Sequence, residues 1–157
     1  MIGSPGAGTS TFSQDPPRRT GLPLTHIGAE YWRPGWVRPP TAEWEAGVRA
    51  LIAPDAWILD GNSTSTVAMR AARADTVIVR DVSRWLCLYR TVRRAWSGRR
   101  PDRLHLGREP LDLEFLRFIW SFPAVQQRQL AGLERLPNLR LVRLRSGAQA
   151  RAWLAGL

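Results

Sequence analysis

The sequence predicts an α/β fold in which a parallel sheet is flanked by helices. Two observations carry this prediction. Short runs rich in Val, Ile and Leu alternate with longer helical segments, and such alternation is typical of parallel sheets covered on both faces. The chain has 157 residues, of which 44% are hydrophobic, and this suits one domain with its own core. We therefore expect a single domain over residues 1–157.

The first strand of this sheet is nearly absent. Only Met1 and Ile2 precede a glycine-rich loop, whereas about five or six residues are usual for a strand. Either the true start of the chain lies upstream, or the strand is lost. A helix begins near Ser10, and we expect Pro16 and Pro17 to end it within about two turns, because proline lacks the backbone donor.

The rest of the chain is expected to supply further strands and helices in alternation. Strands are predicted at 22–27, 57–59, 76–79 and 139–144. Helices are predicted at 41–53, 65–73, 83–100, 111–122, 123–136 and 146–154. Ser83 and Ser146 are the expected N-caps of two of these helices.

Large apolar side chains mark one side of two of the helices. The residues that cover one broad side of the first helix are Trp85, Leu86, Leu88, Tyr89, Val92 and Trp96, and the core candidates in the second are Leu113, Leu116, Phe118, Ile119 and Trp120. The one cysteine, Cys87, lies in the same apolar stretch. A cysteine in such a place is more often core filler than nucleophile.

Charge is the least ordinary feature of the composition. The formal net charge is +10, the isoelectric point is about 11.6, and all 23 basic residues are Arg. Because guanidinium groups bind phosphate oxygens two at a time, this favours nucleotides or, less specifically, nucleic acid as partners. The lone thiol fits a reducing compartment. With neither a signal peptide nor a membrane-spanning run in the sequence, we expect a cytoplasmic protein.

The glycine-rich loop has the spacing of a phosphate-binding loop that lacks its cation. Gly3 and Gly8 fit the motif Gly-x4-Gly-Lys-Ser/Thr, Ser10 stands at the metal-ligand position, and Thr9 replaces the lysine. Backbone N–H groups of such loops converge on one anion. The residues expected to bind phosphate are Gly3, Ser4, Pro5, Gly6, Ala7, Gly8, Thr9, Ser10 and Thr11. A flexible leader is the alternative, because these residue types are common in disordered termini.

Asp60 is expected to hold magnesium together with Ser10. It follows the strand 57–59 directly, and a carboxylate beside a phosphate loop can bind Mg²⁺ or its water. The alternative is a simple turn residue, which Asp-Gly often supplies, and Asp81 ranks second for the metal role. His26 and His105 are isolated from each other in the sequence, so they predict no metal site.

Three arginines are candidates for stabilising a transferring phosphoryl group. Arg90 and Arg94 are four residues apart and therefore share one helix face. Arg117 follows a polar segment at about 99–110, which we expect to form a lid, and it can return to the same place. A solvated basic face explains Arg90 and Arg94 equally well. That alternative is favoured for Arg99, Arg100 and Arg103.

An aromatic segment, Tyr31-Trp32-Arg33-Pro34-Gly35-Trp36, precedes the helix at 41–53. Aromatic rings beside arginine can stack on a base or line an acceptor pocket. A packed loop explains the same residues equally well, so both interpretations stay open.

Together these motifs resemble the adenylate kinase-like nucleotide kinases of the P-loop superfamily, and more narrowly a small bacterial branch labelled topology modulation protein. The matching motifs, in order along nearly the whole chain, are Gly-Ser-Pro-Gly-Ala-Gly, Tyr-Trp-Arg-Pro-Gly-Trp, Trp-Ile-Leu-Asp-Gly-Asn, Arg-Trp-Leu-Cys-Leu-Tyr-Arg and Leu-Glu-Phe-Leu-Arg-Phe-Ile-Trp. The resemblance implies a three-layer P-loop NTPase fold that binds ATP and Mg²⁺ and transfers phosphate to a small acceptor such as a nucleotide. It also implies that Asp60 is the strand-end aspartate of the family, and that Arg90 and Arg94 are the arginines entering the lid.

The departures from the family cluster at the phosphate end. Thr9 replaces the lysine, the first strand is nearly absent, Pro16 and Pro17 interrupt the loop helix, and Gly28 stands where relatives commonly carry an aspartate. Three functions therefore stay open. They are a nucleotide kinase with weakened or lost activity, a non-catalytic nucleotide- or anion-binding module, and a basic nucleic-acid-binding protein. The last has no helix-turn-helix or zinc-finger pattern in its support.

Overall fold

The strands of the sheet are short and parallel. The computed structural model describes residues 1–97 and 111–157, so the predicted lid at 99–110 lies outside the described residues, with Arg99, Arg100, Arg103 and His105. The strands are β1 Ile2–Gly3, β2 Leu24–His26, β3 Ile58–Asp60, β4 Thr76–Arg80 and β5 Arg140–Leu144. β1, β4 and β5 pair in that order, β2 pairs with β3, and every pairing is parallel. The predicted α/β class with a parallel sheet is confirmed.

Met1 joins the two groups of strands. Its backbone nitrogen donates to the Leu59 carbonyl of β3, and its carbonyl accepts a 3.1 Å hydrogen bond from the N–H of Gly61. The strands therefore follow one another across the molecule as β2-β3-β1-β4-β5. The predicted near-absence of the first strand is also confirmed, because β1 has two residues, Ile2 and Gly3, that pair with Val79 and Arg80.

The helices occupy most of the segments between strands. They are α1 Thr9–Phe12, α2 Asp15–Thr20, α3 Ile27–Tyr31, α4 Thr41–Leu51, α5 Val67–Ala71, α6 Arg84–Ser97, α7 Leu113–Leu133 and α8 Gly147–Ala155, with 3₁₀ turns η1 Pro34–Trp36 and η2 Thr64–Thr66. The predicted cap of α8 is present, since the Ser146 hydroxyl accepts from the Gln149 N–H at 3.1 Å. Within the described ranges, no helix has the length and apolar character needed to cross a membrane.

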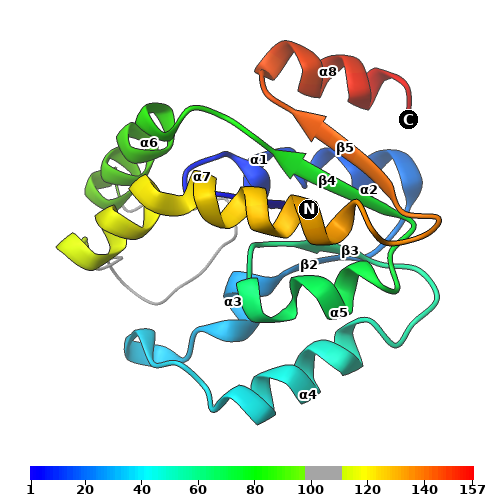
Figure 1. Cartoon of the computed structure of the whole chain (residues 1–157), viewed down its shortest axis with the longest axis horizontal. Helices are drawn as coiled ribbons and strands as arrows, with labels where there is room; N and C mark the ends of the chain where they lie inside the picture. Colours follow the sequence, from blue (N-terminus) through cyan, green and yellow to red (C-terminus); the bar gives the residue numbers. More distant parts are fainter. Residues whose placement is uncertain (98–110) are drawn as a thin grey trace.

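Helices cover both faces of the sheet around β4. Val79 points to one face, where it packs in a cluster with Leu130 of α7. Its neighbour Ile78 points to the opposite face and packs with Phe12 of α1 and Leu154 of α8. Figure 1 shows α7 passing in front of the N-terminal strand, α5 below β2 and β3, and α8 next to β5. This alternation explains why β4 is a continuous apolar run, as expected for a strand buried on both faces.

The predictions about proline hold only in part. The helix after the glycine-rich loop, α1, ends at Phe12, within the predicted two turns. Pro16 and Pro17, however, lie in the first turn of a second helix, α2, where the missing N–H would have no helical partner anyway. Pro123 does not open a helix but lies inside α7. Buried Ile119 and Phe122 precede it and buried Gln126 follows, so packing on both sides offsets the roughly 3 kcal/mol that an interior proline costs a helix.

The buried face of α6 is made of small side chains. Cys87, Thr91 and Ala95 are buried there, whereas most of the large side chains on the apolar side of α6 are exposed. Trp85, Tyr89 and Trp96 are 67%, 61% and 80% exposed, and Leu86 is exposed too. In α7 the core prediction is wrong for Leu113, Phe118 and Trp120, which are exposed, and it holds for Ile119, which is fully buried.

Cys87 provides a test of this packing. It is fully buried, and burial raises the pKa of its thiol, so little thiolate is available to react. We predict that Ellman's reagent modifies the native protein more than about tenfold more slowly than the guanidinium-unfolded chain at pH 8. The denatured chain is the internal control because it contains the same single thiol. Rapid, complete modification of the native protein would contradict the packing of α6.

Candidate functional site

A cleft of about 1220 Å³ opens at the carboxyl ends of β1, β2 and β3. Its described wall includes every residue of the Gly3–Thr11 loop except Ala7, together with residues that follow β2 and β3 and arginines of α6. In open parallel sheets, ligands bind outside the carboxyl ends of the strands where the strand order reverses. The chain goes from β1 toward β2 on one side and from β3 to β4 on the other, so this cleft is the candidate site.

The Gly3–Thr11 loop curls tightly at the base of the cleft. Gly6 and Gly8 both have φ of +81°, a left-handed conformation that strongly favours glycine. The Ala7 N–H donates to the Ser4 carbonyl at 2.9 Å. A Cβ at Gly6 would lie 2.2 Å from the Cys87 carbonyl oxygen and 2.7 Å from the Thr91 hydroxyl oxygen. The loop therefore rests on α6 at a distance that only glycine allows.

Arginines of α6 lie beside this loop. A Cβ at Gly8 would be 3.4 Å from a terminal nitrogen of Arg90, and Arg90 and Arg94 both line the cleft. Arg93 lines it too, although the sequence analysis did not select it. Arg117 is exposed on α7 and is not part of the described lining. The structure thus brings two of the three predicted arginines to the cleft, Arg90 beside the loop itself, and leaves Arg117 outside.

Asp60 is buried at the end of β3 and touches a histidine. Its Oδ2 is 2.9 Å from His26 Nδ1, while its Oδ1 has no hydrogen-bond partner among the described residues. The sequence analysis did not select His26, but β2 and β3 pair in a register that sets His26 opposite Asp60. Part of the signal was present in the sequence, because His26 lies near the end of one predicted strand and Asp60 directly follows another. Neighbouring parallel strands end at the same edge of a sheet, but the sequence did not show that these two strands are neighbours.

Arg70 of α5 fixes the chain that follows Asp60. Its guanidinium donates to the Gly61 carbonyl at 3.1 Å and to the Ser63 carbonyl at 3.3 Å. Burial lowers the pKa of Arg70 to about 10, against the opposite effect of the Asp60 charge. Trp44 of α4 adds an indole hydrogen bond of 2.9 Å to the Ser63 hydroxyl. The sequence analysis missed this arginine because nothing in the spacing separates it from surface arginines.

Asp81, the second-ranked candidate for metal binding, is engaged elsewhere. Its carboxylate accepts a 2.9 Å hydrogen bond from Arg143 and lies 3.5 Å from Arg145 Nε. Asp81 is not part of the described lining of the cleft. Across residues 1–97 and 111–157, no three His, Cys, Asp or Glu side chains gather as a metal site. Ser10 and Asp60 both line the cleft, so any cation there would depend on oxygen ligands such as these.

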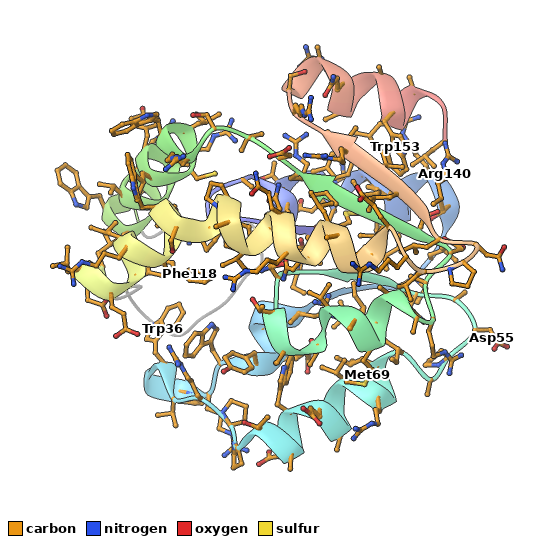
Figure 2. The ribbon with its side chains drawn as sticks, viewed as in Figure 1. Trp36, Asp55, Met69, Phe118, Arg140 and Trp153 are labelled. Atoms are coloured by element: carbon orange, nitrogen blue, oxygen red, sulfur yellow. The ribbon has the colours of Figure 1, made fainter. Side chains whose placement is uncertain are left out.

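Aromatic side chains form the wall opposite α7. Tyr31, Trp32 and Trp36 line the cleft, and their rings meet edge to face at 4.9 Å and 5.5 Å. Arg38 lies 5.7 Å over the Trp32 ring. Figure 2 shows Trp36 and Phe118 reaching toward the cleft from opposite sides. Within the predicted aromatic segment, Tyr31 is the last residue of α3 and Pro34–Trp36 form η1. The Tyr31 ring also packs against the Trp44 ring. The segment therefore contributes both to the packing of α4 and to the wall of the cleft.

Comparison of the chain with protein-family models, curated proteins and solved structures gives no match.

We predict that Gly6→Ala destabilises the protein by more than about 2 kcal/mol, since left-handed backbone alone costs an L-residue about 1–2 kcal/mol and the methyl group would overlap the Cys87 carbonyl. The measurement is urea unfolding followed by circular dichroism. Gly47→Ala is the matched control: Gly47 is exposed in α4 with open space around it, and this change should stabilise by up to about 1 kcal/mol. Equal effects at the two sites would show that the loop does not rest on α6.

A second pair of variants tests Arg70. We expect Arg70→Leu to lower the free energy of unfolding by about 2–4 kcal/mol, because it removes the Arg70 donors to the Gly61 and Ser63 carbonyls and the positive charge near buried Asp60. Arg73→Leu, an exposed change three residues later, should stay within about 0.5 kcal/mol of the unaltered protein. Chemical unfolding measures both. Similar values for the two would mean that Arg70 does not fix the segment after Asp60.

Proposed function

We propose that the cleft binds ATP, with the phosphates on the Gly3–Thr11 loop and Mg²⁺ held by Ser10 and Asp60. We further propose that phosphoryl transfer to a small acceptor is slow or lost. One observation carries this proposal. The loop leaves the carboxyl end of the central strand, turns through Gly6 and Gly8 in the left-handed conformation, and lies beside Arg90.

The loop supplies directed backbone donors and α6 supplies charge. Left-handed glycines alternating with ordinary residues turn successive N–H groups toward one point, which favours an anion. α1 has only four residues, so its dipole contributes less than a long helix would. Arg90 and Arg94 line the same cleft, and charge-assisted hydrogen bonds to phosphate are about twice as strong as neutral ones. A triphosphate fits this arrangement better than a neutral ligand does.

Asp60 fits the role of a magnesium ligand. Mg²⁺ prefers oxygen ligands, and the Asp60 Oδ1 is buried at the cleft without a described protein partner. His26 contacts the other carboxylate oxygen at 2.9 Å, and such contacts orient a ligating group. The Ser10 hydroxyl completes the protein's share of the site. When bound, the ion would neutralise charge on the phosphates.

The aromatic wall suits an acceptor with a flat ring. Trp32 and Trp36 offer ring surfaces in the cleft, and Arg38 lies over Trp32. Stacking on such rings together with an adjacent cation favours an aromatic, anionic molecule. The motif resemblance likewise implies a nucleotide or another small phosphate acceptor.

Thr9 is the reason to expect little turnover. Its hydroxyl replaces an ammonium group that would reach the transferring phosphate, and losing one such electrostatic group costs about 3–4 kcal/mol of transition-state stabilisation. Kinases commonly turn over at about 1–100 per second, so we expect a rate well below that range. The same substitution favours the second candidate function, a module that binds nucleotide without catalysis. Turnover at ordinary kinase rates would contradict both statements.

We predict that Thr9→Lys strengthens ATP binding, because an ammonium group is added next to a loop that already offers backbone donors. The measurement is calorimetric titration of ATP with and without Mg²⁺. Thr41→Lys is the matched control, because it adds the same charge at an exposed position at the start of α4. Asp60→Asn, combined with Thr9→Lys, should remove much of the magnesium dependence of the gain.

Two outcomes of this titration would count against the proposal. If folded Thr9→Lys protein binds ATP no better than Thr41→Lys protein, the loop does not bind phosphate. If Asp60→Asn leaves the magnesium dependence intact, the ion is held by other groups.

A further inference from the structure

An exposed aromatic surface lies outside the cleft. Trp85, Tyr89 and Trp96 of α6 are exposed by more than half, and Trp120 of α7 is 43% exposed. None of these four residues is in the described lining of the cleft. We call them the outer aromatic surface. Large aromatic side chains gathered in water mark an interaction site more often than isolated exposed residues do.

The four side chains form one continuous surface over two helices. Trp85, Tyr89 and Trp96 are spaced by four and seven residues, which sets them on one side of α6. The buried residues of α6, Cys87, Thr91 and Ala95, occupy a different side. The Trp85 and Trp120 rings meet edge to face at 4.9 Å, which joins α6 to α7. Tyr89 and Trp96 also line a shallow hollow of about 440 Å³.

Arginines alternate with these rings. The Arg84 guanidinium lies 4.7 Å over the Trp120 ring, and Arg93 lines the same hollow as Tyr89 and Trp96. Arg117 is exposed one turn before Trp120 on α7. The α6 sequence contains four Arg and no Asp or Glu. The complementary partner is therefore anionic and presents flat apolar groups, and a second copy of this chain, with a net charge of +10, is disfavoured by repulsion.

We propose that the outer aromatic surface binds single-stranded nucleic acid. Proteins that bind single strands without sequence preference combine arginines along the phosphate backbone with aromatic rings on which bases stack. Trp85, Tyr89 and Trp96 supply the rings, while Arg84, Arg93 and Arg117 supply the charge. A duplex is a poorer partner because its bases already stack on each other.

The test is a fluorescence anisotropy titration of a labelled fifteen-residue oligothymidylate with the full chain at two salt concentrations. We expect binding that weakens about tenfold in each of Trp85→Ser and Tyr89→Ser, as loss of one stacking partner predicts. Arg84→Gln should reduce the slope of log affinity against log salt by about 0.7, the value for one phosphate contact on a single strand. Arg151→Gln removes the same charge from exposed α8 and should change neither quantity.

The two aromatic changes are at exposed positions, and circular dichroism identifies any variant that fails to fold. If Trp85→Ser protein does not fold, the affinity of Tyr89→Ser protein alone tests the proposal. Absence of oligothymidylate binding at 50 mM salt would overturn the proposal. So would equal affinity in folded Trp85→Ser and Tyr89→Ser proteins, or complete displacement by ATP, which would place the strand in the cleft. Binding to phosphatidylserine vesicles in place of the oligonucleotide, or Trp85-dependent dimers in sedimentation, would assign the surface to a membrane or to self-association. Failure of ATP binding leaves the tests at Trp85 and Tyr89 unaffected, because the outer aromatic surface shares Arg93 with the described lining of the cleft but none of its four rings.

Discussion

The close approach of the Gly6 backbone to the backbone of α6 is the constraint on which much of the structure depends. A Cβ at Gly6 would lie 2.2 Å from the Cys87 carbonyl oxygen. This approach limits the facing side of α6 to small residues, and Cys87, Thr91 and Ala95 occupy it. Large aromatic residues of the same helix must then turn outward. The adjoining side of the helix directs Arg90 toward Gly8. One steric constraint thus determines the shape of the loop, the charge beside it and the exposed surface of α6.

Charge compensation around Asp60 links the site to the stability of the fold. A buried carboxylate requires partners, because desolvation of an unpaired charge is strongly unfavourable. His26 contacts it directly at 2.9 Å, and the charges of Asp60 and Arg70 attract each other. Arg70 at the same time holds the Gly61 and Ser63 carbonyls. The residues that shape the floor of the cleft therefore also hold β2, β3 and α5 together, and changes there will affect function and folding jointly.

The sequence was informative where a single element determines its own structure. The apolar run Val77, Ile78 and Val79 predicts a strand buried on both faces, whichever segments pack against it. The N-cap at Ser146 likewise depends only on residues next to it in the sequence. Prediction failed where distant segments decide. The exposure of Trp85 depends on how closely the Gly3–Thr11 loop approaches α6, and Pro123 stays helical because residues on both sides of it are buried. His26 is an intermediate case. Its position at the end of a strand could be predicted, but its contact with Asp60 depends on the order of the strands, which the sequence did not specify.

The arginine-rich composition suggested both nucleotides and nucleic acid as partners. In the structure the arginines are divided between two surfaces. Arg90 and Arg94 line the cleft, whereas Arg84 and Arg117 lie outside it. Arg80 and Arg90 concentrate positive charge near the loop. Burial lowers the pKa of Arg80, and the nearby charge of Arg90 lowers that pKa further. Arg80 donates to a neutral acceptor, the Ser146 carbonyl, at 3.3 Å. An anion bound to the loop, as we propose, would relieve this repulsion, and Arg90 would then supply part of the attraction that Thr9 cannot supply.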